Sequence, residues 1–137
     1  MKIAVIDGQG GGIGKTFISK AKNILKDYEI VALGITEKAS VSMLKKGAKE
    51  AYFGEEEIIN YLNNNKIDYI VAPIGVLIGG GINGEVSPVL SNEIFNYSCA
   101  KYIIPLKKHG ITIVGIKDMD IKDIISEIIK EIKENHK

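Results

Sequence analysis

The sequence has little of what several classes of protein require. It contains one cysteine, Cys99, which excludes a disulfide framework or a cysteine-rich zinc site within the chain. Because 18 Lys and Arg residues face 17 Asp and Glu residues, the formal net charge is +1, and nucleic acid is not expected as the main partner. No apolar run approaches the ~20 residues of a membrane-spanning helix. The chain reaches Asp7 and glycines too early for a secretory signal, so we expect a cytoplasmic protein with no membrane partner.

Short apolar runs alternate with amphipathic stretches along the chain, which is typical of a parallel α/β fold. We expect strands at residues 3–6, 30–33, 51–53, 69–72 and 102–106, and helices at 14–25, 40–46, 55–62, 89–97 and 121–132. A sixth strand at 112–116 would follow the turn at 107–110, which is too short for a crossover helix, so it should pair antiparallel with 102–106. The prediction is a three-layer, Rossmann-like domain spanning residues 1–137, with a mostly parallel sheet of order 3-2-1-4-5 and an antiparallel edge strand.

A glycine-rich turn separates the first predicted strand from the first helix, with five glycines among residues 8–14. Glycine lets the backbone turn sharply and approach a ligand closely, and the N-terminus of the following helix favours phosphate. A lysine in a first helical turn, here Lys15, is unfavourable by ~0.3–1 kcal/mol unless an anion lies nearby. The predicted phosphate-binding residues of this turn are Gly8, Gln9, Gly10, Gly11, Gly12, Ile13, Gly14, Lys15 and Thr16.

The spacing of these glycines leaves the kind of nucleotide open. The dinucleotide pattern G-x-G-x-x-G fits in no register. Gly8-x-x-x-Gly12-Ile13-Gly14 resembles the cofactor turn of short-chain dehydrogenases, with Asp7 where that family usually has threonine. Residues 11–16 are similar to the end of the P-loop in partition-type ATPases, but Gly10 stands where those proteins have lysine. The strand at 69–72 also ends without the acid that would hold Mg²⁺, so NAD or NADP is favoured over ATP.

The end of the second strand is where a Rossmann protein binds the adenosine ribose. Gly34 is followed by Thr36 and Lys38. A hydroxyl beside a lysine would suit a 2′-phosphate, so NADP is considered as well as NAD. An ordinary polar turn is the alternative interpretation.

A second glycine-rich segment, residues 73–88, follows the fourth strand. In the predicted topology this strand lies beside the first, where the direction of the crossovers reverses and α/β proteins bind ligands. Pro73 and Gly75 are therefore added to the predicted site, in a cleft that both glycine-rich segments would border. The apolar residues 76–78 indicate a lid or a contact surface, and a mobile loop without function is the alternative.

Catalytic residues are not evident. Glu55 and Glu85 follow strands at the same sheet edge and could act as acid or base, although glutamates near helix starts are commonly solvated. Tyr97 and Lys101 have the Tyr-x-x-x-Lys spacing of short-chain dehydrogenases, but they straddle a predicted helix-to-strand junction. No metal site is predicted.

Several segments resemble a small bacterial family of Rossmann-like proteins known only as a domain of unknown function. The opening from Ile3 to Lys15 carries the likeness, which extends through Met43–Ala48, Pro73–Gly75, Gly84-Glu85 with Pro88, and Ala100-Lys101 to Ile104-Pro105. The resemblance implies the fold and the single-domain size, and it implies no activity.

Three functions follow from these features. We expect a binding or sensing module that holds a (di)nucleotide, NAD(P) favoured, between the two glycine-rich segments. The alternative is an NAD(P)-dependent oxidoreductase whose substrate pocket is completed by dimerisation, since 137 residues leave no separate substrate domain. A P-loop-like ATP-binding switch is the third. A homo-oligomer is expected, with the apolar residues 76–78 as a contact.

Overall fold

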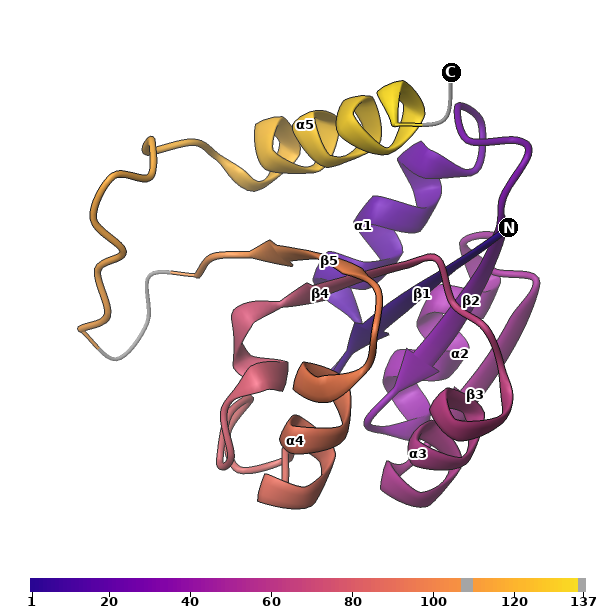
Figure 1. Cartoon of the computed structure of the whole chain (residues 1–137), viewed down its shortest axis with the longest axis vertical. Coiled ribbons are helices and arrows are strands. Elements are labelled where there is room, and N and C mark those ends of the chain that lie inside the picture. Colours follow the sequence, from indigo (N-terminus) through magenta and orange to yellow (C-terminus); the bar gives the residue numbers. More distant parts are fainter. Residues whose placement is uncertain (107–109, 136–137) are drawn as a thin grey trace.

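A computed structural model of the chain describes residues 1–106 and 110–135 (Figure 1). The strands are β1 (Lys2–Asp7), β2 (Glu29–Gly34), β3 (Glu50–Phe53), β4 (Tyr69–Pro73) and β5 (Ala100–Ile104). The helices are α1 (Gly12–Ala21), α2 (Glu37–Lys45), α3 (Glu55–Asn64), α4 (Pro88–Asn96) and α5 (Ile121–Glu134), with a 3₁₀ turn, η1 (Ile74–Leu77). Among these, no helix combines the length and the apolar character needed to cross a membrane.

The five strands form one sheet in the order β3-β2-β1-β4-β5, and every pair is parallel. Val5 lies opposite Ala32 of β2 on one side and Val71 of β4 on the other. The predicted Rossmann-like fold and strand order are confirmed. The switch point lies between β1 and β4, because β1 leads to the β2 side of the sheet and β4 leads to the β5 side.

The antiparallel edge strand predicted at 112–116 is wrong. These residues are not in a strand, and Val114 is 93% exposed. A strand requires one face packed against the core, whereas residues 111–116 are all exposed and Gly115 has a φ of 91°, a turn conformation. Figure 1 shows residues 110–120 as an extended arm that lies away from the sheet. Positions 107–109 of the predicted turn lie outside the described residues.

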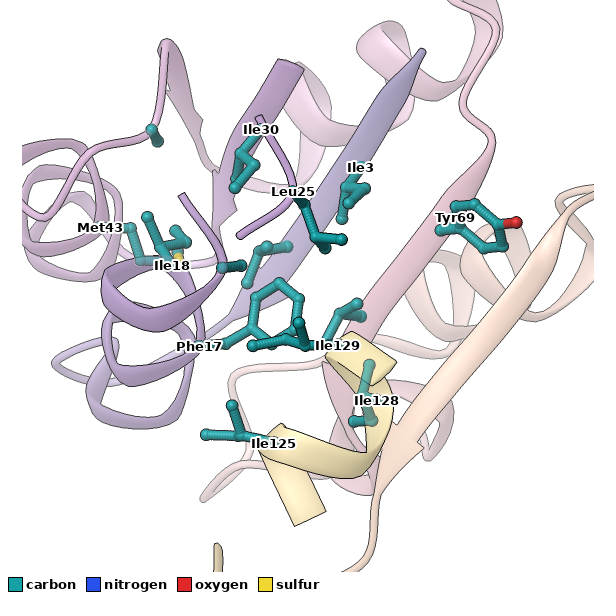
Figure 2. Close-up of a cluster of buried hydrophobic side chains, with 14 of the residues drawn as sticks. Ile3, Phe17, Ile18, Leu25, Ile30, Met43, Tyr69, Ile125, Ile128 and Ile129 are labelled. Atoms are coloured by element: carbon teal, nitrogen blue, oxygen red, sulfur yellow. The ribbon is translucent and has the colours of Figure 1, made fainter. Parts of the chain in front are cut away.

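Alternating residues of the buried strands pack on opposite faces of the sheet, which produces the three layers. On one face, Ile3 and Val5 of β1 join α1, α2 and α5 in one apolar cluster. Figure 2 shows Phe17 of α1 and Ile129 of α5 pointing toward each other over β1. On the other face, Ala4 and Ile6 pack with α3 and α4. Both layers leave the carboxyl ends of β1 and β4 free to carry loops.

Helix α5 confirms the helix predicted at 121–132 and carries a stripe of isoleucines on one face. Asp120 caps the helix, since its side chain accepts a hydrogen bond from the Asp123 N–H at 2.9 Å. The stripe residues buried against the sheet are Ile125, Ile128, Ile129 and Ile132. The first residue of the stripe, Ile121, is 36% exposed, because the helix begins there beyond the edge of the core.

Candidate functional site

The glycine-rich turn joins β1 to α1 at the carboxyl edge of the sheet. Gly11 caps the helix in the left-handed conformation, with a φ of 71°, and its N–H donates to the Gly8 carbonyl at 2.9 Å. Gln9, two residues before it, also has a positive φ of 47°. A tight turn of this kind can direct several backbone N–H groups toward one concavity, as in an anion-binding nest.

Asp7, the last residue of β1, organises the inside of this turn. It is 6% exposed, and its two carboxylate oxygens accept hydrogen bonds from the N–H groups of Gly8 and Gly14, each at 2.8 Å. Burial raises the pKa of the Asp7 carboxyl, while the N–H groups of Gly14, Gly8 and Ile13 act to lower it. The N-terminus of α1 therefore already holds an acid supplied by the protein itself.

At all but two of the fifteen glycine positions, the fold itself gives a reason for the absence of a side chain. Seven glycines have positive φ, and at six others a Cβ would come within 3.4 Å of a neighbouring atom. Gly14, for example, would bring a Cβ to 2.5 Å from the Met43 sulfur. At Gly10 a Cβ would meet only the Lys38 Cε, at 3.8 Å, and at Gly12 it would meet nothing within 4 Å. In the described part of the chain, the N–H groups of Gly10 and Gly12 also have no hydrogen-bond partner.

The loop after η1, residues 78–86, is closed by its own backbone hydrogen bonds. The Gly80 N–H donates to Val86 O at 2.7 Å, and the Gly84 N–H donates to Gly80 O at 3.0 Å. Ile82 has a φ of 49° and Asn83 has a φ of 53°. A β-branched residue rarely adopts such a φ, so Ile82 is held there by its surroundings.

The turn and the loop border one pocket of about 460 Å³, within the usual size range of small-molecule sites. The cleft predicted between the two glycine-rich segments is thus present in the structure. Its apolar lining comes from Ile13, Ile74, Ile78, Ile82, Leu106 and Ile111. Asp7 lies at its lining as well, so the pocket combines an apolar wall, open backbone N–H groups and one buried acid.

The predicted binding residues divide into two equal groups. Seven line the pocket: Gly8, Gln9, Gly10, Gly12, Ile13, Pro73 and Gly75. The other seven lie in the described structure but outside this lining: Gly11, Gly14, Lys15, Thr16, Gly34, Thr36 and Lys38.

The second group has mostly structural contacts. The Thr36 hydroxyl donates to Gln9 O at 2.5 Å and accepts from the Ala39 N–H at 3.1 Å, so it already has partners in the protein. The Thr16 hydroxyl donates to Gly12 O at 2.8 Å, and Gly34 packs against the Ser40 backbone. Lys15 is half-buried and Lys38 is exposed.

The two candidate catalytic glutamates, Glu85 and Glu55, have different hydrogen-bond partners. Glu85 is half-buried and accepts a hydrogen bond from the Gln9 N–H at 2.9 Å. Glu55 is exposed and accepts one from the Ser87 hydroxyl. No three acidic, histidine or cysteine side chains of the described residues cluster as metal ligands would.

The Tyr97–Lys101 pair also lies apart from the pocket. The Tyr97 hydroxyl donates to Asn65 O at 2.7 Å and accepts from the Ile67 N–H at 2.8 Å. Both partners precede β4, at the edge of the sheet opposite the glycine-rich turn, so this pair does not face the site.

Sequence reasoning missed the roles of Asp7, Ile82, Leu106 and Ile111. Asp7 could have been found from its position, since an acid directly after a buried strand and before a glycine can bond the N–H groups of the next turn. No local signal identifies the three apolar residues, because their place in the pocket depends on how distant loops pack.

The comparisons with known proteins show a family and carry no activity. Residues 2–137 match the model of a family described as a domain of unknown function (DUF3842). No curated protein matches the sequence. The chain belongs to this family, as the resemblance noted from its sequence predicted.

Proposed function

We propose that this member of the family is a nucleotide-binding module, with NAD(P) as the favoured ligand, which binds in the pocket between the glycine-rich turn and loop 78–86. Gly10 and Gly12 carry the proposal. Both line the pocket, neither is needed as glycine by the fold, and neither N–H group has a hydrogen-bond partner among residues 1–106 and 110–135. Close approach of a ligand to the backbone is a physical reason for glycine at such positions.

The charge around these N–H groups supports an anionic ligand at this end of the pocket. The nest at Gln9–Gly11 and the start of α1 favour negative charge. The Lys38 side chain passes close to Gly10 and would add a cation from α2. A phosphate on the Gly10 and Gly12 N–H groups would lie between these features.

A dinucleotide suits the pocket better than a nucleoside triphosphate. The apolar side chains of Ile13, Ile74 and Ile82 line the pocket and would pack against a flat ring. β4 ends in Ala72 and Pro73, which have no side-chain oxygen to hold the Mg²⁺ that a triphosphate requires. The engaged Thr36 hydroxyl leaves Lys38 as the remaining candidate for a 2′-phosphate, so NAD and NADP are both retained.

The oxidoreductase alternative would need a second copy of the chain. The exposed arm at 110–116 begins beside the pocket, since Ile111 lines it. We propose that copies of the chain associate through this arm, so that a partner could complete the site.

Thermal unfolding with NAD, NADH, NADP, NADPH, ATP, ADP and GTP, each with and without Mg²⁺, tests the proposal. A ligand at 100 times its Kd should stabilise the fold by ~2.7 kcal/mol. We expect one dinucleotide to raise Tm without Mg²⁺. No shift with any of the seven would refute the proposal.

Alanine variants of the two open glycines then locate the site. Gly10→Ala and Gly12→Ala should retain wild-type Tm or gain ~0.4–1 kcal/mol of stability, because the fold has room for both methyl groups. The same variants should lose most of the ligand-induced shift. Lys38→Ala should weaken binding, whereas Lys45→Ala, at the other end of α2, serves as the matched control. Unaltered binding in both glycine variants would place the ligand elsewhere.

A further inference from the structure

The Glu85 carboxylate already accepts a hydrogen bond from one N–H group of the nest, that of Gln9. The Gln9 N–H donates to the Glu85 carboxylate at 2.9 Å, and a Cβ at Gly8 would collide with that same carboxylate. The lack of a side chain at Gly8 therefore gives Glu85 access to the turn. An anion supplied by the second loop thus stands next to the open N–H groups of Gly10 and Gly12.

Glu85 is also the polar link between the loop and the turn. Within the described residues, its bond to Gln9 is the one hydrogen bond that joins residues 78–86 to residues 8–14. The loop also has apolar contacts: Ile82 lies where a Cβ at Gly8 of the turn or at Gly75 of η1 would approach it to 3.0 Å. The loop is closed by its own hydrogen bonds, and Val86 anchors its end in the core, so opening this link would free the tip of the loop.

The backbone of the loop favours such a movement. Ile82 and Asn83 both have positive φ, and a β-branched residue in this region is strained. The strain persists only while the surroundings hold the loop in place. Loss of the Glu85 bond removes the polar contact to the turn from among those that do so.

We infer that Glu85 is a latch, which closes loop 78–86 over the pocket and yields the Gln9 N–H when an anionic ligand binds to the turn. This inference rests on the proposed function. A phosphate at Gly10 and Gly12 would bring a second negative charge close to the Glu85 carboxylate, and Asp7 already supplies a third beneath the turn. Like charges at such distances repel. Asp7 is buried and fixed by two N–H groups, so Glu85 is the group that can leave.

Two variants separate the charge of Glu85 from its hydrogen bond. Glu85→Gln removes the charge but keeps an oxygen that can accept from Gln9. Glu85→Ala removes both. Glu57→Gln removes one charge from an exposed site in the first turn of α3 and is the matched control.

Hydrogen exchange of the ligand-free protein tests the latch itself. The amides of Gln9 and residues 78–86 should exchange faster in Glu85→Ala than in the wild type, and at nearly the wild-type rate in Glu85→Gln and Glu57→Gln. Equal exchange in Glu85→Ala and the wild type would overturn the latch, whether or not any nucleotide binds.

Binding of the dinucleotide found by thermal unfolding, with inorganic pyrophosphate as a second probe, tests the displacement. Removing a like charge close to the ligand should tighten binding by roughly tenfold in Glu85→Gln, with no change in Glu57→Gln. Equal or weaker binding in Glu85→Gln would overturn the displacement while leaving the binding site intact. Faster exchange in Glu85→Ala with no binding of either probe to any variant would instead refute the proposed function, and with it the displacement.

Discussion

Asp7 is the residue on which the turn and the candidate site both depend. Its carboxylate bonds the N–H groups at the two ends of the turn, Gly8 and Gly14. A neutral asparagine could accept only one of these bonds, because its amide nitrogen would face the other donor. Asp7 therefore stabilises the turn itself, and an anionic ligand would have to bind to the N–H groups that Asp7 does not occupy, those of Gly10 and Gly12.

The protonation of Asp7 should be visible in the pH dependence of stability. Burial raises the pKa of Asp7 above its ordinary value of 3.8, and the charge of Glu85 adds to this rise. The folded state then holds the proton more tightly than the unfolded state. The stability that Asp7 contributes is thus fully present below pH 3.8 and is lost as pH rises through the folded pKa.

Urea unfolding of the wild type and Asp7→Asn across this pH range provides the check. We expect the free-energy difference between the two proteins to shrink as pH increases. Asp27→Asn, at an exposed position, controls for the general loss of a carboxylate. A difference that stays constant or grows with pH would contradict the assignment.

At the scale of elements, α2 supports the turn from the side. Thr36 caps α2 and also donates to the Gln9 carbonyl, and Gly11 packs against the Ala39 backbone. The first turn of α2 and the glycine-rich turn are therefore one structural unit. Lys38 reaches Gly10 because of this packing.

Removing the Thr36 hydroxyl should loosen both parts of this unit. Thr36→Ala loses a helix cap and a second hydrogen bond, which together should cost about 1–2 kcal/mol of unfolding free energy. Thr36→Ser keeps the hydroxyl and should recover most of that loss. The midpoints of urea unfolding measure both, and a serine variant as unstable as the alanine variant would show that the methyl group, and not the hydroxyl, matters.

The arm at residues 110–116 carries a run of exposed apolar side chains: Ile111, Ile113, Val114 and Ile116. Val114 is 93% exposed and Ile116 is 52% exposed, although isoleucine and valine are usually buried. Within the described part of the chain, β5 is an edge strand with β4 as its one neighbour, and such an edge together with an exposed apolar segment favours pairing with another chain. The two features lie next to the pocket.

We expect the chain to self-associate through the arm. Sedimentation velocity should show an oligomer for the wild type and a shift toward monomer for Val114→Lys. Phe95→Lys, at a 64% exposed position on α4, is the matched control and should leave the assembly unchanged. A monomeric wild type, or equal behaviour of the two variants, would contradict association through the arm.

The sequence by itself determined the order of elements, the parallel sheet and the place of the glycine-rich turn. These are local or periodic properties: isoleucines at helical spacing in α5, short apolar runs for buried strands, and glycines between β1 and α1. The strand order followed from the general rules for such alternation. The pairing of the two glycine-rich segments across one cleft followed from the same rules.

Only the tertiary structure decided which residues of that cleft are available to a ligand. Gly10 and Gly14 look alike in the sequence, but a Cβ at Gly14 would collide with the Met43 sulfur, whereas a Cβ at Gly10 would meet only the end of the Lys38 side chain in ordinary contact. Thr36 and Glu85 are polar residues of loops, and their partner in the turn, Gln9, is distant in sequence. The segment at 112–116 has the composition of a strand yet finds no core to cover. These outcomes depend on packing between segments far apart in the chain, to which local sequence patterns do not respond.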